Sequence, residues 1–374
     1  MRKKLLFLTL LFFSLTLSAA DIFVDQSAPT GGDGSSWATA FQDIQSAIDI
    51  AVADDTIYIA AGIYRPEDTI EITVPLNFRG GYPAGGGVQN IDAHITQIQA
   101  DFDPGNLILR IFDIDPNAAA SFTGLRFFNC RQVIVTASNL SINQLQFEQC
   151  LNAIFLAGTI DFCTIENSSF TDFTSDMIAG PSVVMQNFGI QNSILENSTG
   201  RAIFLGDDVA NFSMIDCIIR DFNNSASTVS LDETNATITN LLVEDNVSTA
   251  GAIIFFRDTD LTLANATFNN NTGEGTICLQ GSTSELNLID SNFTNNRSVS
   301  VFPKPVMGMR DVVITATHCL FENNYAEGSQ PDAVGEIRGD TSGALITFEQ
   351  CEFINNTAIG SITCLLYTSP SPRD

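Results

Sequence analysis

Apolar and polar residues alternate along this chain in a unit that repeats every twenty to thirty residues. The stretch 261–296 shows the unit twice: an alternating apolar pair, then a Phe with an Asn three residues later. Alternation in twos is the pattern of a half-buried strand, and no window keeps a helical period long enough for a helix in each repeat. The pattern therefore predicts repeats built from short strands.

The repeats align on one apolar anchor position. Successive anchors lie 20 to 32 residues apart, at Phe127, Phe147, Phe170, Ile194, Ile219, Val243, Phe268, Phe293, Phe321 and Phe353. Units of this length are too small to bury a core alone and must stack on one another. Leucine-rich repeats share the period but need a Leu-rich consensus ending in Asn. We therefore expect an all-β, right-handed parallel β-helix, a solenoid of roughly a dozen coils that rise about 4.8 Å each.

Two kinds of position can be assigned within the coil. The pairs Ile203/Leu205, Val229/Leu231, Ile253/Phe255 and Ile277/Leu279 recur at a similar spacing and should stack inside the tube. Strict alternation then turns Phe204, Ile254 and Phe256 outward, where they form a candidate binding platform or oligomer contact. The Asn residues three places after the anchors are Asn197, Asn246, Asn271, Asn296, Asn324 and Asn356. Asn tolerates a left-handed turn, and stacked amides can hydrogen-bond from coil to coil.

The two ends of the chain depart from the repeat. Residues 1–20 carry a basic start, an apolar run and small residues at the cleavage position, so they read as a secretory signal peptide, which predicts a secreted or cell-surface protein. Residues 364–374 (CLLYTSPSPRD) look like a translated sequencing adapter. We expect residues 21–363 to be a single β-helix domain, truncated at its C-terminus, with regular coils over about 121–363.

An N-terminal cap is expected over about residues 21–55. Phe41, Ile44, Ile48 and Ala51 fall on one face of a short helix, which Thr39 and Gln42 would start as a capping box. Such a helix would cover the open end of the tube, whose strand edge and core are otherwise exposed.

Charge and cysteine content narrow the function classes. The formal net charge is −27, and a field of that sign repels nucleic acids and anionic membranes, which argues against both as partners. The odd cysteine count of the mature chain does not indicate a disulfide framework or a zinc site. The pairs Cys319/Cys351 and Cys130/Cys150 can lie close enough to bridge, or can fill a buried column as free thiols.

Two motifs carry a resemblance to known proteins. The F-x-x-N repeat together with G-A-I, at 250–253 and as S-G-A-L at 342–345, resembles the repeats of bacterial surface β-helix proteins, including the polymorphic membrane proteins of chlamydiae, which carry G-G-A-I. Residues 34–41 (GSSWATAF) and 55–64 (DTIYIAAGIY) are similar to the opening module of secreted pectin-lyase-like repeat proteins. The resemblance implies the fold, which carries lyases, hydrolases, adhesins and inert stalks.

The enzymes of this fold imply what a catalytic site would look like. Polygalacturonases carry N-T-D, D-D, G-H-G and R-I-K motifs, and of these only Asp207-Asp208 occurs here. A weaker group of charged residues closes successive coils: Asp207 and Asp208, Asp232 and Glu233, then Arg257 and Asp258. Stacking would align them, so that Asp207, Asp208 and Asp232 could hold Ca²⁺ as a cofactor, and Arg257 could act on an acidic substituent. The alternative is a solvated edge whose charges prevent pairing.

Two functions follow from these observations. The first is a non-catalytic secreted or surface-displayed adhesin or stalk that binds a polysaccharide or a cell-surface ligand. The second is a calcium-dependent polysaccharide lyase or glycoside hydrolase using Arg257, Asp207 and Asp208. In the first, Asp232, Glu233, Asp258 and the outward apolar residues Phe204, Ile254 and Phe256 would contact the ligand.

Overall fold

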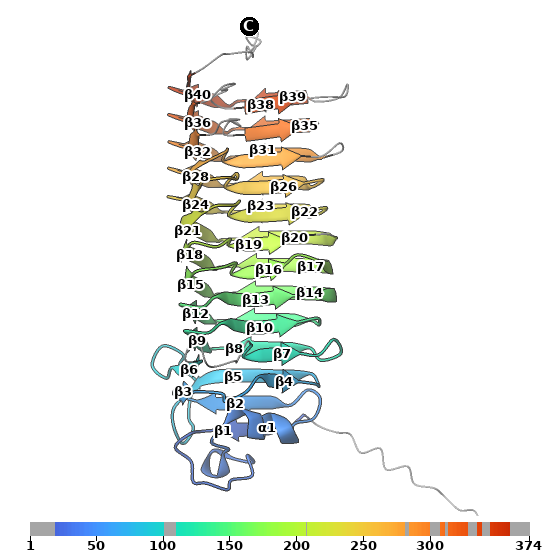
Figure 1. Cartoon of the computed structure of the whole chain (residues 1–374), viewed down its shortest axis with the longest axis vertical. Helices are drawn as coiled ribbons and strands as arrows, with labels where there is room; N and C mark the ends of the chain where they lie inside the picture. The colour runs from blue at the N-terminus through green and yellow to red at the C-terminus, as the bar shows by residue number, and fades with distance from the viewer. Residues whose placement is uncertain are drawn as a thin grey trace, which may run out of the picture.

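The computed structural model describes residues 19–100, 110–206, 208–280, 284–299, 307–310, 313–327, 335–338 and 345–359. Over these residues the chain is a right-handed parallel β-helix, and each strand pairs in parallel with the equivalent strand of the next coil (Figure 1). The predicted fold is confirmed. The expected signal peptide, apart from Ala19 and Ala20, and the tail 364–374 lie outside the described residues.

The first face of the β-helix is a 13-stranded sheet whose strands pair in chain order. Its strands are β1 (Asp21–Val24), β2 (Thr56–Ala60), β5 (Leu76–Tyr82), β8 (Ala120–Thr123), β11 (Leu140–Asn143), β14 (Gly158–Glu166), β17 (Val183–Gln191), β20 (Val209–Ile215), β23 (Asn235–Thr239), β27 (Asp260–Ala264), β31 (Glu285–Ile289), β35 (Val313–Thr317) and β39 (Leu345–Glu349).

The second face is an 11-stranded sheet. Its strands are β4 (Ile70–Ile72), β7 (Phe112–Ile114), β10 (Gln132–Thr136), β13 (Asn152–Leu156), β16 (Ile178–Gly180), β19 (Ile203–Leu205), β22 (Val229–Asp232), β26 (Ile254–Arg257), β30 (Ile277–Gln280), β34 (Met307–Arg310) and β38 (Gly335–Arg338).

The third face, the anchor sheet, carries the anchor residues. Its strands are β3 (Gly62–Tyr64), β6 (Thr96–Gln99), β9 (Arg126–Phe128), β12 (Gln146–Glu148), β15 (Ser169–Phe173), β18 (Ile194–Ser198), β21 (Ile218–Asn224), β24 (Leu242–Glu244), β28 (Thr267–Asn269), β32 (Asn292–Thr294), β36 (Leu320–Glu322) and β40 (Glu352–Ile354). From the end of β21 a short side column continues through β25 (Val247–Ser248), β29 (Thr272–Gly273), β33 (Arg297–Val299), β37 (Tyr325–Glu327) and β41 (Thr357–Ile359).

The anchor side chains stack inside the tube as predicted. The rings of Phe268 and Phe293 lie 4.9 Å apart and 3° from parallel, and both side chains are fully buried. One anchor is wrong: Leu195, not Ile194, pairs with Phe170 and with Ile219. This coil is one residue longer than the alignment assumed, and two adjacent apolar residues left the choice open to error.

The Asn residues after the anchors form an internal ladder. The Nδ2 atom of Asn246 donates to Oδ1 of Asn271 at 2.9 Å, and Asn271 donates in the same way to Asn296 at 2.9 Å. Each amide also donates to the carbonyl of an anchor in the preceding coil, as Asn271 does to Val243 at 2.9 Å. These amides are buried with their hydrogen bonds satisfied, as buried polar groups require.

The left-handed turn, however, is one residue earlier than predicted. Asp245, Asn270 and Asn295 have φ of 57°, 54° and 58°, and each directly precedes a ladder Asn. A side chain that continues the ladder must point inward, so the turn falls on its neighbour. Asn197 is itself such a turn residue, with φ of 54°, and bonds the exposed side chain of Asp172 instead of joining the ladder.

The cap covers the β1 end of the stack (Figure 1). Helix α1 (Ile44–Ile50) buries Ile44 and Ala47, and a 3-10 turn, η1 (Trp37–Thr39), precedes it. The predicted capping box is wrong, because Asp43 is the N-cap and its side chain accepts from the Ser46 amide at 2.8 Å. No helix in the described part of the chain is long and apolar enough to cross a membrane.

A loop of the cap contains a carboxylate, Asp33, whose pKa is lowered by hydrogen bonds. The carboxylate of Asp33 accepts from the Ser35 amide at 3.0 Å, from the Ser35 hydroxyl at 2.7 Å and from the Thr39 hydroxyl at 2.7 Å. These bonds lower its pKa from 3.8 to about 2. Since the folded pKa is the lower one, the stabilisation is complete above the unfolded pKa and is lost as the pH falls through about 2.

We therefore expect an NMR titration of the Asp33 carboxyl carbon to show a midpoint near 2 in the folded protein. In urea-unfolded protein the midpoint should return to near 3.8, because the three hydrogen bonds are gone. A folded-state midpoint near 3.8 would contradict the geometry of this loop.

Candidate functional site

The charged residues that close the coils of the 11-stranded sheet lie only partly together. Asp232 pairs in register with Arg257 in the next coil, and Oδ2 of Asp232 lies 2.5 Å from a terminal guanidinium nitrogen of Arg257. Asp207 lies outside the described residues. Asp208, Glu233 and Asp258 have φ of 59°, 48° and 48°. Left-handed backbone favours Asp, so it explains Asp208 and Asp258 without a ligand.

The calcium site at this edge stays a prediction, because one of its three candidate ligands lies outside the described residues. Within the described ranges, no group of three or more His, Cys, Asp or Glu side chains is placed to hold a metal ion. Ca²⁺ takes about six to eight oxygen ligands. Of the candidate ligands Asp207, Asp208 and Asp232, the first is not described and the last is in an ion pair with Arg257.

The prediction that Ile254 and Phe256 face outward is wrong. Both are buried, with 2% and 0% of their surface exposed, and Ile254 pairs with Val229 and Ile277 inside the tube. The outward residue of this strand is Phe255. The reason is one extra residue in the turn before β26, which shifts the alternation by one position.

That extra residue is accommodated at Gly251. The paired strands β21 and β25 are in register up to Ser248, but the next strand then starts one residue later than in the preceding coil. A Cβ atom on Gly251 would lie 2.6 Å from the backbone nitrogen of Ser227, so the turn packs against the coil below too closely for any side chain.

With this register, the outer face of the 11-stranded sheet carries an aromatic column. We define the aromatic column as Phe155, Ala179, Phe204, Ser230 and Phe255, which pair in register from β13 to β26. The three Phe side chains are half-buried. Large and small residues alternate, so the rings lie two coils apart, roughly 9.6 Å. The predicted outward position of Phe204 is confirmed.

An ordered arginine flanks the aromatic column. Arg201 forms a bidentate pair with Asp176 of the preceding coil, with Nε to Oδ1 at 2.9 Å and the terminal nitrogen to Oδ2 at 2.6 Å. Its Cζ atom lies 3.5 Å from the centroid of the Phe204 ring. This geometry fixes the guanidinium plane against the ring and leaves further N–H groups for a ligand.

Sequence reasoning missed Arg201 and Asp176. They lie 25 residues apart, one coil length, and each lies two residues before a strand of the 11-stranded sheet. Opposite charges at one coil spacing are the signal that could have found them. The two ion pairs thus lie on opposite edges of the sheet: Asp176–Arg201 where its strands begin, and Asp232–Arg257 where they end.

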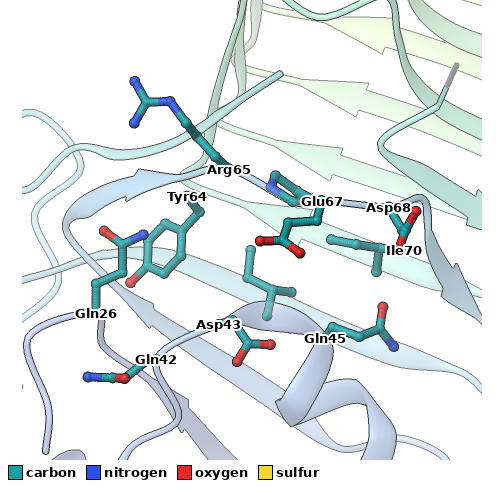
Figure 2. Close-up of a pocket in the computed structure, with 11 residues that line it drawn as sticks. Gln26, Gln42, Asp43, Gln45, Tyr64, Arg65, Glu67, Asp68 and Ile70 are labelled. Atoms are coloured by element: carbon teal, nitrogen blue, oxygen red, sulfur yellow. The ribbon is translucent and has the colours of Figure 1, made fainter. Parts of the chain in front are cut away.

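A separate pocket of about 470 Å³ lies at the capped end, between α1 and residues 64–70 (Figure 2). Its polar side chains are largely bonded within the protein: Gln26 to the Ile63 carbonyl at 2.8 Å, Gln42 to the Ala28 carbonyl at 2.7 Å, Gln45 to Asp49 at 2.7 Å, and Asp43 to Ser46. Tyr64, whose pKa burial raises, donates to the Ala60 carbonyl at 3.1 Å. These contacts hold the cap together and account for the glutamines, Asp43 and Tyr64 of the lining.

Comparisons with known proteins agree with the fold. Residues 131–304 match the family model described as the right handed beta helix region. The chain is similar to the catalytic domain of a GH87 alpha-1,3-glucanase in complex with tetrasaccharides, with a TM-score of 0.57 and 13% identity over 90% of this chain and 66% of that one. The chain thus spans about two thirds of the glucanase domain. At this identity the similarity shows the fold alone.

Two further solved structures resemble the chain more distantly. One is the A-module of the mannuronan C-5 epimerase AlgE6 of Azotobacter vinelandii, with a TM-score of 0.42 and 10% identity over 84% of this chain and 95% of that one. The other is pectate lyase Pel9A, with 0.39 and 11% over 87% and 80%. No curated protein matches the chain.

Proposed function

We propose that the protein is a secreted or cell-surface glycan-binding protein, an adhesin or stalk, whose ligand lies along the aromatic column. The observation that carries this proposal is the repeated, half-buried Phe on alternate coils of the outer face of the 11-stranded sheet. Sugar rings present an apolar C–H face, and rigid aromatic side chains with a nearby polar group suit such a ligand.

The spacing of the rings favours an extended chain over a single sugar. Phe155, Phe204 and Phe255 repeat every two coils along the long axis, a distance comparable to two sugar residues of an extended glycan. The small residues Ala179 and Ser230 leave room between the rings. We infer that the glycan runs parallel to the axis of the β-helix.

Charge favours a neutral glycan. The net charge of −27 repels a polyanion at long range. Arg201 and Arg257 are both neutralised by a carboxylate, but their remaining N–H groups can donate to sugar hydroxyls. The F-x-x-N repeats, similar to those of chlamydial surface proteins, and the glucanase among the structural neighbours support a carbohydrate-binding role at a cell surface.

The test is binding to a panel of neutral and acidic oligosaccharides, followed by calorimetry with Phe155→Ala and Phe255→Ala. Each variant should weaken binding roughly threefold to tenfold, because a ring contact of this kind contributes about 0.5–1.5 kcal/mol. Phe162→Ala is the matched control, since Phe162 is 40% exposed on the 13-stranded sheet. Unchanged affinity in both column variants would contradict the proposal.

The same panel tests the enzymatic alternative. A calcium-dependent lyase or hydrolase using Arg257, Asp207 and Asp208 would release products in the presence of Ca²⁺, and Arg257→Ala would abolish their release. Binding without turnover, weakened by the column variants and unaffected by a calcium chelator, is the result that we expect.

A further inference from the structure

Two pairs of cysteines lie directly above one another in adjacent coils. Cys130 and Cys150 each follow a stacked anchor Phe by three residues, and the amide after Cys150 donates to the Cys130 carbonyl at 2.9 Å. Cys319 and Cys351 lie two residues before the stacked anchors Phe321 and Phe353, and the amide of Glu352 donates to the Cys319 carbonyl at 2.9 Å. The thiols point into the tube, since the Cys130 sulfur lies 3.8 Å from the Ile98 carbonyl oxygen and the Cys351 sulfur lies 3.3 Å from the Ala316 carbonyl oxygen.

This geometry fits a disulfide. Adjacent coils are separated by about 4.8 Å, inside the range of about 4.4–6.8 Å between Cα atoms that a disulfide spans. None of the seven described cysteines is in a disulfide in this structure. The other three are not stacked on a cysteine: Cys163 lies between Leu140 and Phe188, Cys278 between Phe255 and Gly308, and Cys217 between coils that carry Ser193 and Leu241.

The first pair replaces part of the amide ladder. Cys130 and Cys150 occupy the position that ladder Asn residues take in later coils, and the Cys150 sulfur lies 3.9 Å from the Phe127 carbonyl oxygen, where a ladder Asn would donate. Two stacked thiols cannot make the strong amide-to-amide bond of the Asn pairs. A covalent link would supply the missing coil-to-coil connection there.

The thiols differ in reactivity. A hydrogen bond from the Cys150 thiol lowers the pKa of Cys130, whereas burial raises the pKa of Cys150 and raises that of Cys319 to about 11. Cys351 is the one described cysteine that is partly exposed.

We propose that Cys130–Cys150 and Cys319–Cys351 are disulfides that link adjacent coils in the exported protein. Each closure removes two electrons and two protons from two thiols, and the oxidant is a small disulfide such as oxidised glutathione, which is reduced to two thiols. Because Cys130 and Cys150 are buried, their bridge closes during folding, before the next coils cover it.

The test uses the full chain refolded in oxidised glutathione and digested with trypsin without reduction. Arg131 follows Cys130 directly, so a bridge would join peptide 127–131 to peptide 132–201. The latter also holds Cys163, so the digest is made on Cys163→Ala, which leaves Cys150 as its one cysteine. For the second pair, cleavage after Arg338 separates Cys319 from Cys351, and Cys364→Ala leaves Cys351 as the only cysteine of the following peptide.

We expect to recover both disulfide-linked peptides. We also expect the thermal unfolding midpoint to fall by several degrees when the bridges are reduced. Cys130→Ser with Cys150→Ser should abolish the first linked peptide and part of the shift, whereas Cys217→Ala, a buried cysteine without a stacked partner, should keep both bridges. Recovery of Cys130 and Cys319 as unlinked, alkylatable peptides after oxidative refolding, or their linkage to other cysteines, would overturn the proposal.

Discussion

Phe293→Ala is expected to lower the free energy of unfolding by about 3–5 kcal/mol. The Phe293 ring is fully buried between the rings of Phe268 and Phe321, whose centroids lie 4.9 Å and 5.1 Å away, with interplanar angles of 3° and 8°. Removing it leaves a cavity that two parallel strands on either side cannot close, because their hydrogen bonds hold the coil spacing. The loss in free energy of unfolding therefore has two parts: the transfer free energy of the buried ring and the cost of a cavity that the structure cannot close.

Urea unfolding followed by circular dichroism measures this change, with Phe162→Ala as the control. Phe162 is 40% exposed, so the same truncation there should change the free energy of unfolding by less than about 0.5 kcal/mol. Equal effects of the two substitutions would mean that the anchors do not form a continuous packed column.

Asn271→Ala is expected to cost about 3 kcal/mol, although it removes far fewer atoms. The Asn271 amide accepts from the backbone and the side chain of Asn246, and donates to the Val243 carbonyl and to Asn296. Truncation leaves several of these buried groups without a partner, and each such group costs about 1–3 kcal/mol unless water reaches it.

Asn292→Ala, at an exposed position on β32, is the matched control and should be nearly neutral. Amide hydrogen exchange tests the ladder at a single position, because the backbone amide of Asn246 donates to Oδ1 of Asn271 at 3.2 Å. Protection of this amide should fall in Asn271→Ala and stay unchanged in Asn292→Ala. Retained protection in Asn271→Ala would show that the ladder does not hold adjacent coils together.

The repeat period and its Phe anchors were sufficient to predict the fold, because a stacked ring column and strand alternation leave a direct trace in the sequence. The register of individual strands was harder to predict from the sequence. Phe255 follows a turn that is one residue longer than in the coil below, and one residue exchanges the inner and outer faces of a strand. Leu195 ends a coil whose extra residue lies earlier, in the turn before β17. Turn length is set by backbone packing, such as the close approach at Gly251, which composition does not reveal.

Some residues of the candidate site could also be predicted from the sequence, and others could not. The alternation of side chains along a strand predicts that Phe204 points outward. The coil length predicts that Asp232 and Arg257 lie side by side. The contact of Arg201 with the Phe204 ring could not be predicted, because it depends on how a long side chain folds back from a turn. Charged residues in the turns could equally be explained by left-handed backbone, which the structure shows for Asp208, Glu233 and Asp258.

The amide ladder also gives the β-helix an electrical direction. Every described step, from Asn246 through Asn271, Asn296 and Asn324 to Asn356, donates from Nδ2 of one coil to Oδ1 of the next. The side-chain dipoles are therefore aligned head to tail, and each bond polarises the next one in the row. Their sum places partial positive charge toward the Asn356 coil, so the interior of this acidic solenoid has a polarity along its long axis, comparable in origin to that of an α-helix.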